Sequence, residues 1–293
     1  MLSEEKEISH PEISHYLDYR KYLAEFLSFK KEQTRKDLRP YGASHFAAAA
    51  DFKSPHYLNL VISGQRNLSI KMTVKFCRAL SLSKLEGDEF VLLVRYNQAH
   101  DPTQRSLFLR ALNDLRVQKK IKSGEIKSSD WQRWPDWVGW VLYALADQKG
   151  VPTNPTEIVK LLRHQVSLDQ LRRSLHHLIE QGLISVDAHT GLWVKSKNGV
   201  EVAEEVPVAV VRKLQSQLME LGLESLYRDP ADEREFGSLT LSLTQSEFEE
   251  LRFQLRKLRK SIHKENAIHR MENKGDRIYQ LNLQLFPVSD PSK

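Results

Sequence analysis

The chain lacks several features by which common protein classes are recognised. Its 293 residues include one cysteine, Cys77, which excludes an internal disulfide and a cysteine-based zinc site. No run of about 18 apolar residues is present, as a membrane helix would require. The first residues, MLSEEKEISHPEISH, are polar and acidic, unlike a secretory signal. We therefore expect a soluble cytoplasmic protein that does not enter membranes.

Motifs that carry catalytic chemistry are also missing. The sequence contains no phosphate-binding GxxxxGK, no dinucleotide-binding GxGxxG, no zinc-binding HExxH and no GxSxG nucleophile motif. Its eleven histidines are scattered along the chain. We expect no enzyme activity, no catalytic residues, no metal site and no cofactor.

Acidic residues are absent from one stretch of the chain, residues 52–85. The same stretch carries six basic residues, a number equal to the formal net charge of the whole chain, +6: Lys53, Arg66, Lys71, Lys75, Arg78 and Lys84. A segment with this charge balance is suited to a phosphate backbone. The alternative is an ordinary three-helix core with a solvated basic surface.

Residues 41–83 predict a helix-turn-helix. A first short helix is expected near 44–50, with Phe46 and alanines on its inner side. Ser54 followed by Pro55 suits the start of a second helix, which should end at Gly64. Ser69 is expected to cap a third helix, whose apolar residues close a small core.

The second helix, residues 55–62, is the predicted recognition helix in a major groove. We expect Ser54, His56 and Asn59 to lie closest to base edges. Lys53, Arg66 and Lys71 are expected to contact phosphates. The complete set of candidate DNA-binding residues is Lys53, Ser54, His56, Asn59, Ser63, Gln65, Arg66, Asn67 and Lys71.

Further helices are predicted on both sides of this motif, over 16–36, 85–97 and 103–122, before an expected linker at 122–130. Four tryptophans follow, Trp131, Trp134, Trp137 and Trp140. They suit the wall of a second core or an interface, and a ligand-stacking cage is the alternative.

A winged-helix-like arrangement is predicted next. It comprises helices at 137–147, 156–163 and 167–181 and a hairpin that pairs 183–186 with 192–195. Such modules bind either DNA or other partners. The residues expected on the exposed face of its third helix, a possible second DNA or partner surface, are Gln170, Arg173, Ser174 and His177.

The last part of the chain predicts a helix over 203–220 and then a strand-helix-strand unit. Leucines alternate with polar residues over 237–244 and again over 278–286, which is the period of a strand. Ser246 with Glu249 is the expected capping box of the helix between them. Two strands and one helix form too thin a layer alone, so either the winged domain covers them or two subunits join as a homodimer.

The fold class that follows is mainly α with small β elements, an α+β arrangement. Three domains are expected: an N-terminal helical domain at 1–122, a winged-helix-like domain at 123–200 and a C-terminal unit at 201–293, a possible dimerisation unit.

Several sequence motifs resemble one bacterial family. SPHYLNLVISGQRNLS, FCRALSLS and FVLLVRYNQAHD in the first half, with REFGSLTLSLTQSEFEEL and DRIYQLNLQLFP near the end, are similar to the TIGR02147 family, whose members carry the DUF4423 domain. The resemblance implies a transcriptional regulator with an N-terminal helix-turn-helix similar to the phage-repressor (Xre) type. Asp51 stands where such motifs usually have glycine, and the loop before Pro55 is one residue longer.

These observations together predict a sequence-specific DNA-binding transcriptional regulator. Its expected partners are double-stranded DNA, a second copy of the chain and an unknown small-molecule or protein effector. The alternative is a protein-interaction or ligand-sensing adaptor that keeps the helix-turn-helix fold without binding DNA.

Overall fold

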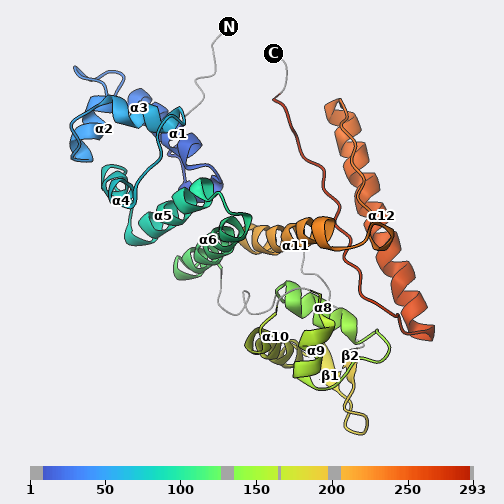
Figure 1. Ribbon diagram of the computed structural model, residues 1–293. Coiled ribbons are helices and arrows are strands. Elements are labelled where there is room, and N and C mark those ends of the chain that lie inside the picture. Colours follow the sequence, from blue (N-terminus) through green and yellow to red (C-terminus); the bar gives the residue numbers. More distant parts are fainter. Residues whose placement is uncertain (1–8, 127–134, 164–165, 197–205, 291–293) are drawn as a thin grey trace. The chain divides into compact units, whose positions relative to one another are not determined.

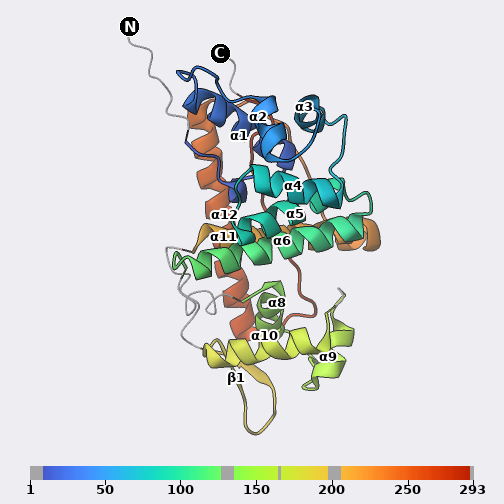
Figure 2. The same cartoon turned by 90° about the vertical axis from the view of Figure 1, so that its left-hand side faces the viewer.

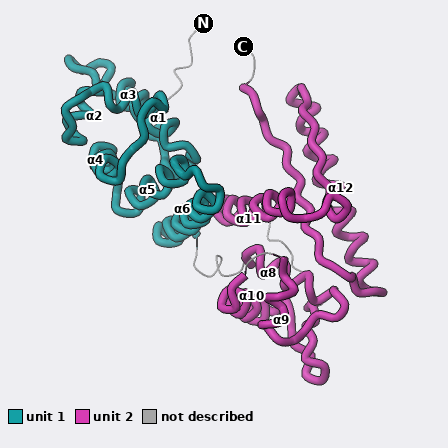
Figure 3. Tube along the Cα trace, viewed as in Figure 1, with its two compact units in different colours: residues 1–127 teal, residues 128–293 magenta. Residues whose placement is uncertain are grey.

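The computed structural model describes residues 9–126, 135–163, 166–196 and 206–290. The chain divides into two compact units, residues 1–127 and 128–293 (Figure 3). Its described residues are mainly helical, with one small two-stranded sheet (Figure 1). This confirms the predicted fold class at the level of mainly α with small β, whereas the finer three-domain division stays a prediction. Across these residues, no helix has the length and apolar character needed to cross a membrane.

The first unit is built from consecutive helices whose starts follow local capping. Asp18, Ser69, Ser83 and Asp101 each accept a hydrogen bond from a backbone N–H in the first turn of the helix that follows. The elements are η1 (Ile13–His15), α1 (Tyr19–Gln33), α2 (Ala43–Ala49), α3 (His56–Ile62), α4 (Ile70–Ala79), α5 (Lys84–Gln98) and α6 (Pro102–Lys122). The helices predicted in this unit are confirmed, with ends that shift by up to three residues.

One apolar core joins the helices of this unit. It is rich in aromatic rings, and its largest fully buried side chains include Tyr19, Tyr22, Phe46, Phe76 and Phe90. The rings of Phe46 and Phe76 meet edge to face with centroids 5.0 Å apart, which is a favourable aromatic geometry. Residues of α1, α2, α3 and α4 therefore share one core.

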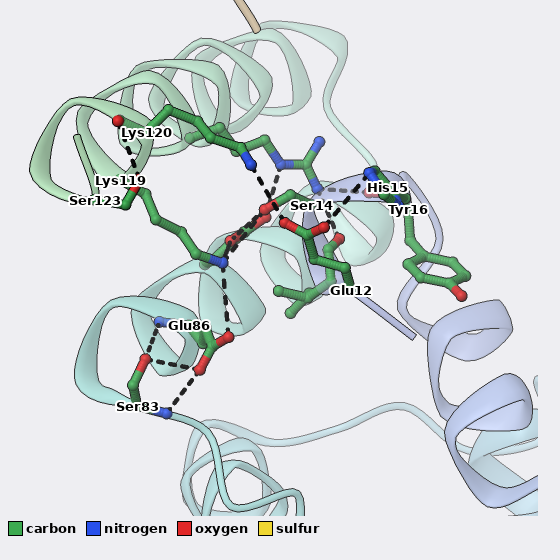
Figure 4. A network of polar contacts seen from close by, with 12 residues as sticks. Glu12, Ser14, His15, Tyr16, Ser83, Glu86, Lys119, Lys120 and Ser123 are labelled. Atoms are coloured by element: carbon green, nitrogen blue, oxygen red, sulfur yellow. Dashed lines mark hydrogen bonds and ion pairs between the residues drawn. The ribbon is translucent and has the colours of Figure 1, made fainter. Parts of the chain in front are cut away.

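A buried charged network fastens η1 to α5 and α6. Glu89 is fully buried and accepts a 2.8 Å hydrogen bond from Arg116 Nε. Arg116 Nη2 also donates to the carbonyl oxygen of Tyr16, at 2.6 Å. Lys119 lies 3.3 Å from the Glu89 carboxylate and 3.4 Å from Ser14 Oγ, and Figure 4 shows its amine pointing toward Ser14 and Glu86. Because each charge has a partner, burial of this network is tolerated.

The second unit contains the three helices and the hairpin predicted over 137–195. Its first part comprises α8 (Trp137–Leu145), α9 (Pro155–Leu161), α10 (Leu168–Glu180), β1 (Ile184–Val186) and β2 (Trp193–Lys195). The two strands pair antiparallel, with Ile184 opposite Lys195, and Gly191 takes a positive φ in the turn, which confirms the hairpin. Trp137 is buried in the core of this unit, whereas Trp131 and Trp134 lie outside the described residues.

The rest of the unit comprises α11 (Val208–Arg228), η2 (Ala231–Glu233) and α12 (Gln245–Glu272). Two predictions here are wrong in detail. The helix expected over 203–220 begins at Val208 and continues to Arg228. The capping box of α12 is Thr244 with Glu247, rather than Ser246 with Glu249, because Thr244 Oγ1 accepts the Glu247 N–H while Glu247 accepts from the Thr244 N–H.

The two strands predicted around α12 do not form. Residues 237–244 and 278–286 run as irregular segments on either side of the helix, as Figure 1 and Figure 2 show. Within the described chain, no backbone-to-backbone hydrogen bond involves residues 235–243 or 276–288. A strand requires a neighbouring strand to accept and donate its backbone bonds, and one chain supplies none at these positions.

Candidate nucleic-acid interface

The turn between α2 and α3 is held in place by one acidic residue. Asp51 adopts a φ of +50°, in the left-handed region that Asp tolerates better than most residues other than glycine. Lys75 Nζ from α4 lies 2.9 Å from the Asp51 carboxylate and also donates to the Asp51 carbonyl oxygen. The Lys75 hydrogen bond holds the pKa of Asp51 below its ordinary value. Asp51 can therefore replace the glycine that is usual in such a turn.

Aromatic rings support α3 from its inner side. Phe52 stacks on Phe76, with centroids 5.9 Å apart and planes 13° from parallel. The ring of Tyr57 contacts both of them edge to face. Leu58 and Val61 are buried beneath the same helix. One side of α3 is thus fixed in the core, so its opposite side faces outward.

The loop that follows α3 is tied to distant parts of the first unit. Arg20 Nε donates to the Val61 carbonyl oxygen at 3.1 Å, and Arg20 Nη2 donates to the Asn67 amide oxygen at 2.7 Å. Gln98, at the end of α5, accepts from the Leu68 N–H and donates to the Leu68 carbonyl oxygen. These bonds fix both the end of α3 and the approach to α4.

Sequence reasoning missed Arg20 and Gln98 as positioning residues. Arg20 lies 41 residues before Val61, and Gln98 lies 30 residues after Leu68. No local pattern marks either residue, since an arginine or glutamine on a helix surface is ordinary. Their role becomes visible only when the tertiary contacts are known.

The nine candidate DNA-binding residues are all exposed in the structure. They come from the loop before α3, from α3 itself, and from the loop and first turn that follow it. Two of them also contact the fold: the Asn67 amide oxygen binds Arg20, and Ser63 Oγ donates to the Leu60 carbonyl oxygen. Lys53, His56, Asn59 and Arg66 show no such side-chain hydrogen bond within the described residues.

The positive charges of the acid-free stretch are mostly uncompensated. Lys75 is the member that pairs with a carboxylate, Asp51. The other five are exposed and form no ion pair with any described residue: Lys53, Arg66, Lys71, Arg78 and Lys84. Exposed cations without internal partners are free to bind an external polyanion.

The second candidate surface, on α10, is largely not a surface. Ser174 is buried and donates to the carboxylate of Asp136, the residue that caps α8. Gln170 and His177 are half-buried, and Arg173 is exposed as expected. The prediction that all four residues are exposed is therefore wrong, because α10 turns this side toward the start of α8. The described residues also contain no group of three or more potential metal ligands.

Comparison with known proteins identifies a family for the second half of the chain. No curated protein and no solved structure shows significant similarity to the chain. A family model described as "Domain of unknown function (DUF4423)" matches residues 117–288, which is more than half of the chain and includes most of the second unit. The match begins after residues 41–83, the segment predicted to form a helix-turn-helix. On this evidence, the chain belongs to the DUF4423 family.

Proposed function

We propose that this chain is a sequence-specific DNA-binding transcriptional regulator, with α3 as the recognition helix of a repressor-type helix-turn-helix. The observation that carries the proposal is the combination of this motif with five exposed, unpaired cations in a stretch without acidic residues. Such a surface attracts the phosphate backbone of DNA, and the backbone contacts set the register of the helix in the groove.

Base reading is assigned to the outward side of α3. The His56 and Asn59 side chains are exposed and not engaged by the fold among the described residues. An asparagine amide can donate to and accept from an adenine edge at the same time. The core beneath α3 and the bonds from Arg20 and Gln98 hold the helix and its loop before DNA arrives, which lowers the ordering cost of binding.

The first experiment is selection of bound sequences from a randomised duplex library by the purified full chain at about 0.15 M salt. An enriched motif is expected. Asn59→Ala should relax the preference at one base position, because a bidentate base contact is worth about 1–3 kcal/mol of discrimination. Arg66→Ala should weaken binding to every sequence similarly and reduce the slope of log K against log salt by roughly 0.9.

Lys257→Ala provides a charge-matched control. Lys257 is exposed on α12 in the second unit, so this variant loses the same charge without touching the helix-turn-helix. It should retain both the motif and the salt slope. If Asn59→Ala loses equal affinity for selected and random DNA, Asn59 is not a base reader. If the chain enriches no sequence, an adaptor that recognises a protein or small molecule becomes the better explanation.

A further inference from the structure

The segments on either side of α12 present leucines that the described chain covers only in part. No residue of 229–290 is buried. Eight large apolar side chains of these segments and of α12 are 38–86% exposed: Leu239, Leu241, Leu243, Leu258, Ile262, Tyr279, Leu281 and Leu283. Monomeric soluble proteins rarely leave a set of this size open.

The segment at 278–286 is attached to its own chain by the side opposite its leucines. Ile278 packs against the core of the second unit, and Asn282 Nδ2 donates to the Leu218 carbonyl oxygen of α11 at 2.9 Å. In an extended chain, residues 278 and 282 lie on one side and residues 279, 281 and 283 on the other. The leucine side is therefore the free side.

The two segments also begin close together. Arg277, just before one segment, lies 2.9 Å from Glu233, which precedes the other. Arg163 binds the same Glu233 carboxylate and also Asp229. The starts of both segments are thus fixed to the second unit, while residues 237–243 and 278–286 form no backbone-to-backbone hydrogen bond with any described residue.

Neither segment carries the protection that an exposed edge normally has. Residues 237–244 and 278–286 contain no charged residue and no proline, in a chain in which 28% of residues are charged. Natural edge strands use lysine, other charges or proline to prevent pairing with another chain. Because both segments lack these residues, we infer that they are suited to pairing with another chain.

The exposed apolar area matches what one partner contributes to a dimer. Burial of a large aliphatic side chain removes on the order of 100 Å² of apolar surface. Because the eight side chains are about half exposed on average, they still offer roughly 400 Å². A standard interface buries about 800 Å² on each side, of which a little over half, roughly 450 Å², is apolar. A partner that buries these apolar side chains must be available whenever the chain is folded. A second copy of the chain is always available, and it brings the same neutral segments.

We propose that the chain forms a two-fold dimer in which residues 237–244 and 278–286 pair as strands with the same segments of a second copy, beside the two α12 helices. In a two-fold arrangement each segment can meet its symmetry mate in antiparallel register, which gives one edge of each segment the backbone bonds that it lacks in the single chain. The proposal is independent of DNA binding, since the dimer forms without nucleic acid.

The test combines two measurements on the full chain without DNA. Sedimentation equilibrium at micromolar concentration should give the mass of two chains. Amide hydrogen exchange should show slow exchange over 238–243 and 279–285, at least about 100-fold slower than expected for unpaired backbone. The double variant Leu241→Lys, Leu281→Lys should raise the dimer dissociation constant at least about 100-fold and should restore rapid exchange in both segments.

Thr240→Asn is the control, because Thr240 is exposed on the polar side of the same segment and a neutral polar side chain there should leave the dimer intact. A one-chain mass for the unsubstituted protein would overturn the proposal, whether the segments exchange rapidly or are protected by pairing within one chain. A two-chain mass with rapid exchange in both segments would also overturn it, since the dimer would then use another surface. Hydrogen exchange on the unsubstituted chain keeps the proposal testable even if the double variant fails to fold.

Discussion

The first unit and the region around α12 contrast sharply in how they use regularly spaced apolar residues. In the first unit, regularly spaced apolar residues are buried in one core that includes Leu58, Phe76, Phe90 and Leu93. In residues 229–290, equally regular leucines are left uncovered. Periodicity therefore tells which residues will share a face, but it does not tell whether one chain can cover that face.

Hydrogen bonding explains the difference. A helix forms its backbone bonds within its own segment, so the predicted helices of the first unit exist as soon as their apolar faces meet. A strand forms its backbone bonds with a neighbour, and the alternating segments at 237–244 and 278–286 have none in the described chain. The same contrast predicts where substitutions will be most harmful.

The largest effect is expected from breaking the buried charge network of the first unit. Arg116→Met removes one of the two cations that contact the fully buried Glu89, leaving Lys119, and it also removes the donor to the Tyr16 carbonyl oxygen. Removal of one member of a buried ion pair costs about 3–5 kcal/mol, because the remaining charge loses part of its compensation. Urea unfolding of the full chain would measure this loss in the free energy of unfolding.

Lys122→Met is the control for that variant, since Lys122 is exposed near the end of the same helix. Its effect should stay within about 0.5 kcal/mol. A loss below about 1 kcal/mol for Arg116→Met would mean that Lys119 alone compensates Glu89, and that the Arg116 bonds do not secure η1.

Leucine-to-alanine substitution in the first unit and in the region around α12 gives the most direct comparison. Its expected effect is smaller than that of Arg116→Met. Leu93 is fully buried and Leu239 is 86% exposed. Leu93→Ala should cost about 2–5 kcal/mol at any protein concentration. Leu239→Ala should cost less than about 0.5 kcal/mol in dilute solution, and its cost should grow as the concentration rises, because association adds to stability.

Thermal or urea unfolding at several chain concentrations would make that measurement. If the Leu239→Ala effect does not change with concentration, the leucine segments take no part in association. If Leu93→Ala is as mild as Leu239→Ala, the first unit would lack the tight core that its burial indicates.

Local signals made most of the first unit predictable. Ser69 and Ser83 accept first-turn N–H groups at helix starts, and Asp101 precedes a proline at the first helical position. Asp51, at the position where such motifs usually have glycine, adopts the left-handed conformation that Asp tolerates. Each of these features depends on a few consecutive residues, which is why sequence reasoning reached them.

Features that depend on distant residues were not predictable in the same way. Gln98 binding both backbone groups of Leu68 and Ser174 turning toward Asp136 join positions 30 and 38 residues apart. Even the start of α12 was displaced by two residues, since both Thr244 with Glu247 and Ser246 with Glu249 fit a capping box. Local chemistry alone does not choose between such equal alternatives.

The smallest expected effect concerns the thiol of Cys77, which lies at the contact of α4 with α5, with its sulfur 3.7 Å from the Gly87 carbonyl oxygen. Burial raises the pKa of this thiol to about 11 from a usual value near 9.0. Because the folded chain holds the thiol proton more tightly, this group's contribution to stability is fully present below pH 9 and is lost between about pH 9 and 11.

The same shift predicts slow alkylation. The thiolate is the reacting form of the thiol. Because the pKa of Cys77 is raised from 9.0 to about 11, the folded chain should react roughly 100-fold more slowly at pH 8 than the chain unfolded in urea. The rate of iodoacetamide labelling as a function of pH would measure this, with Cys77→Ala as the blank for other sites. Equal rates for folded and unfolded chains would show that the α4–α5 contact opens readily, and that this part of the first unit is as uncovered as the leucine segments of the second.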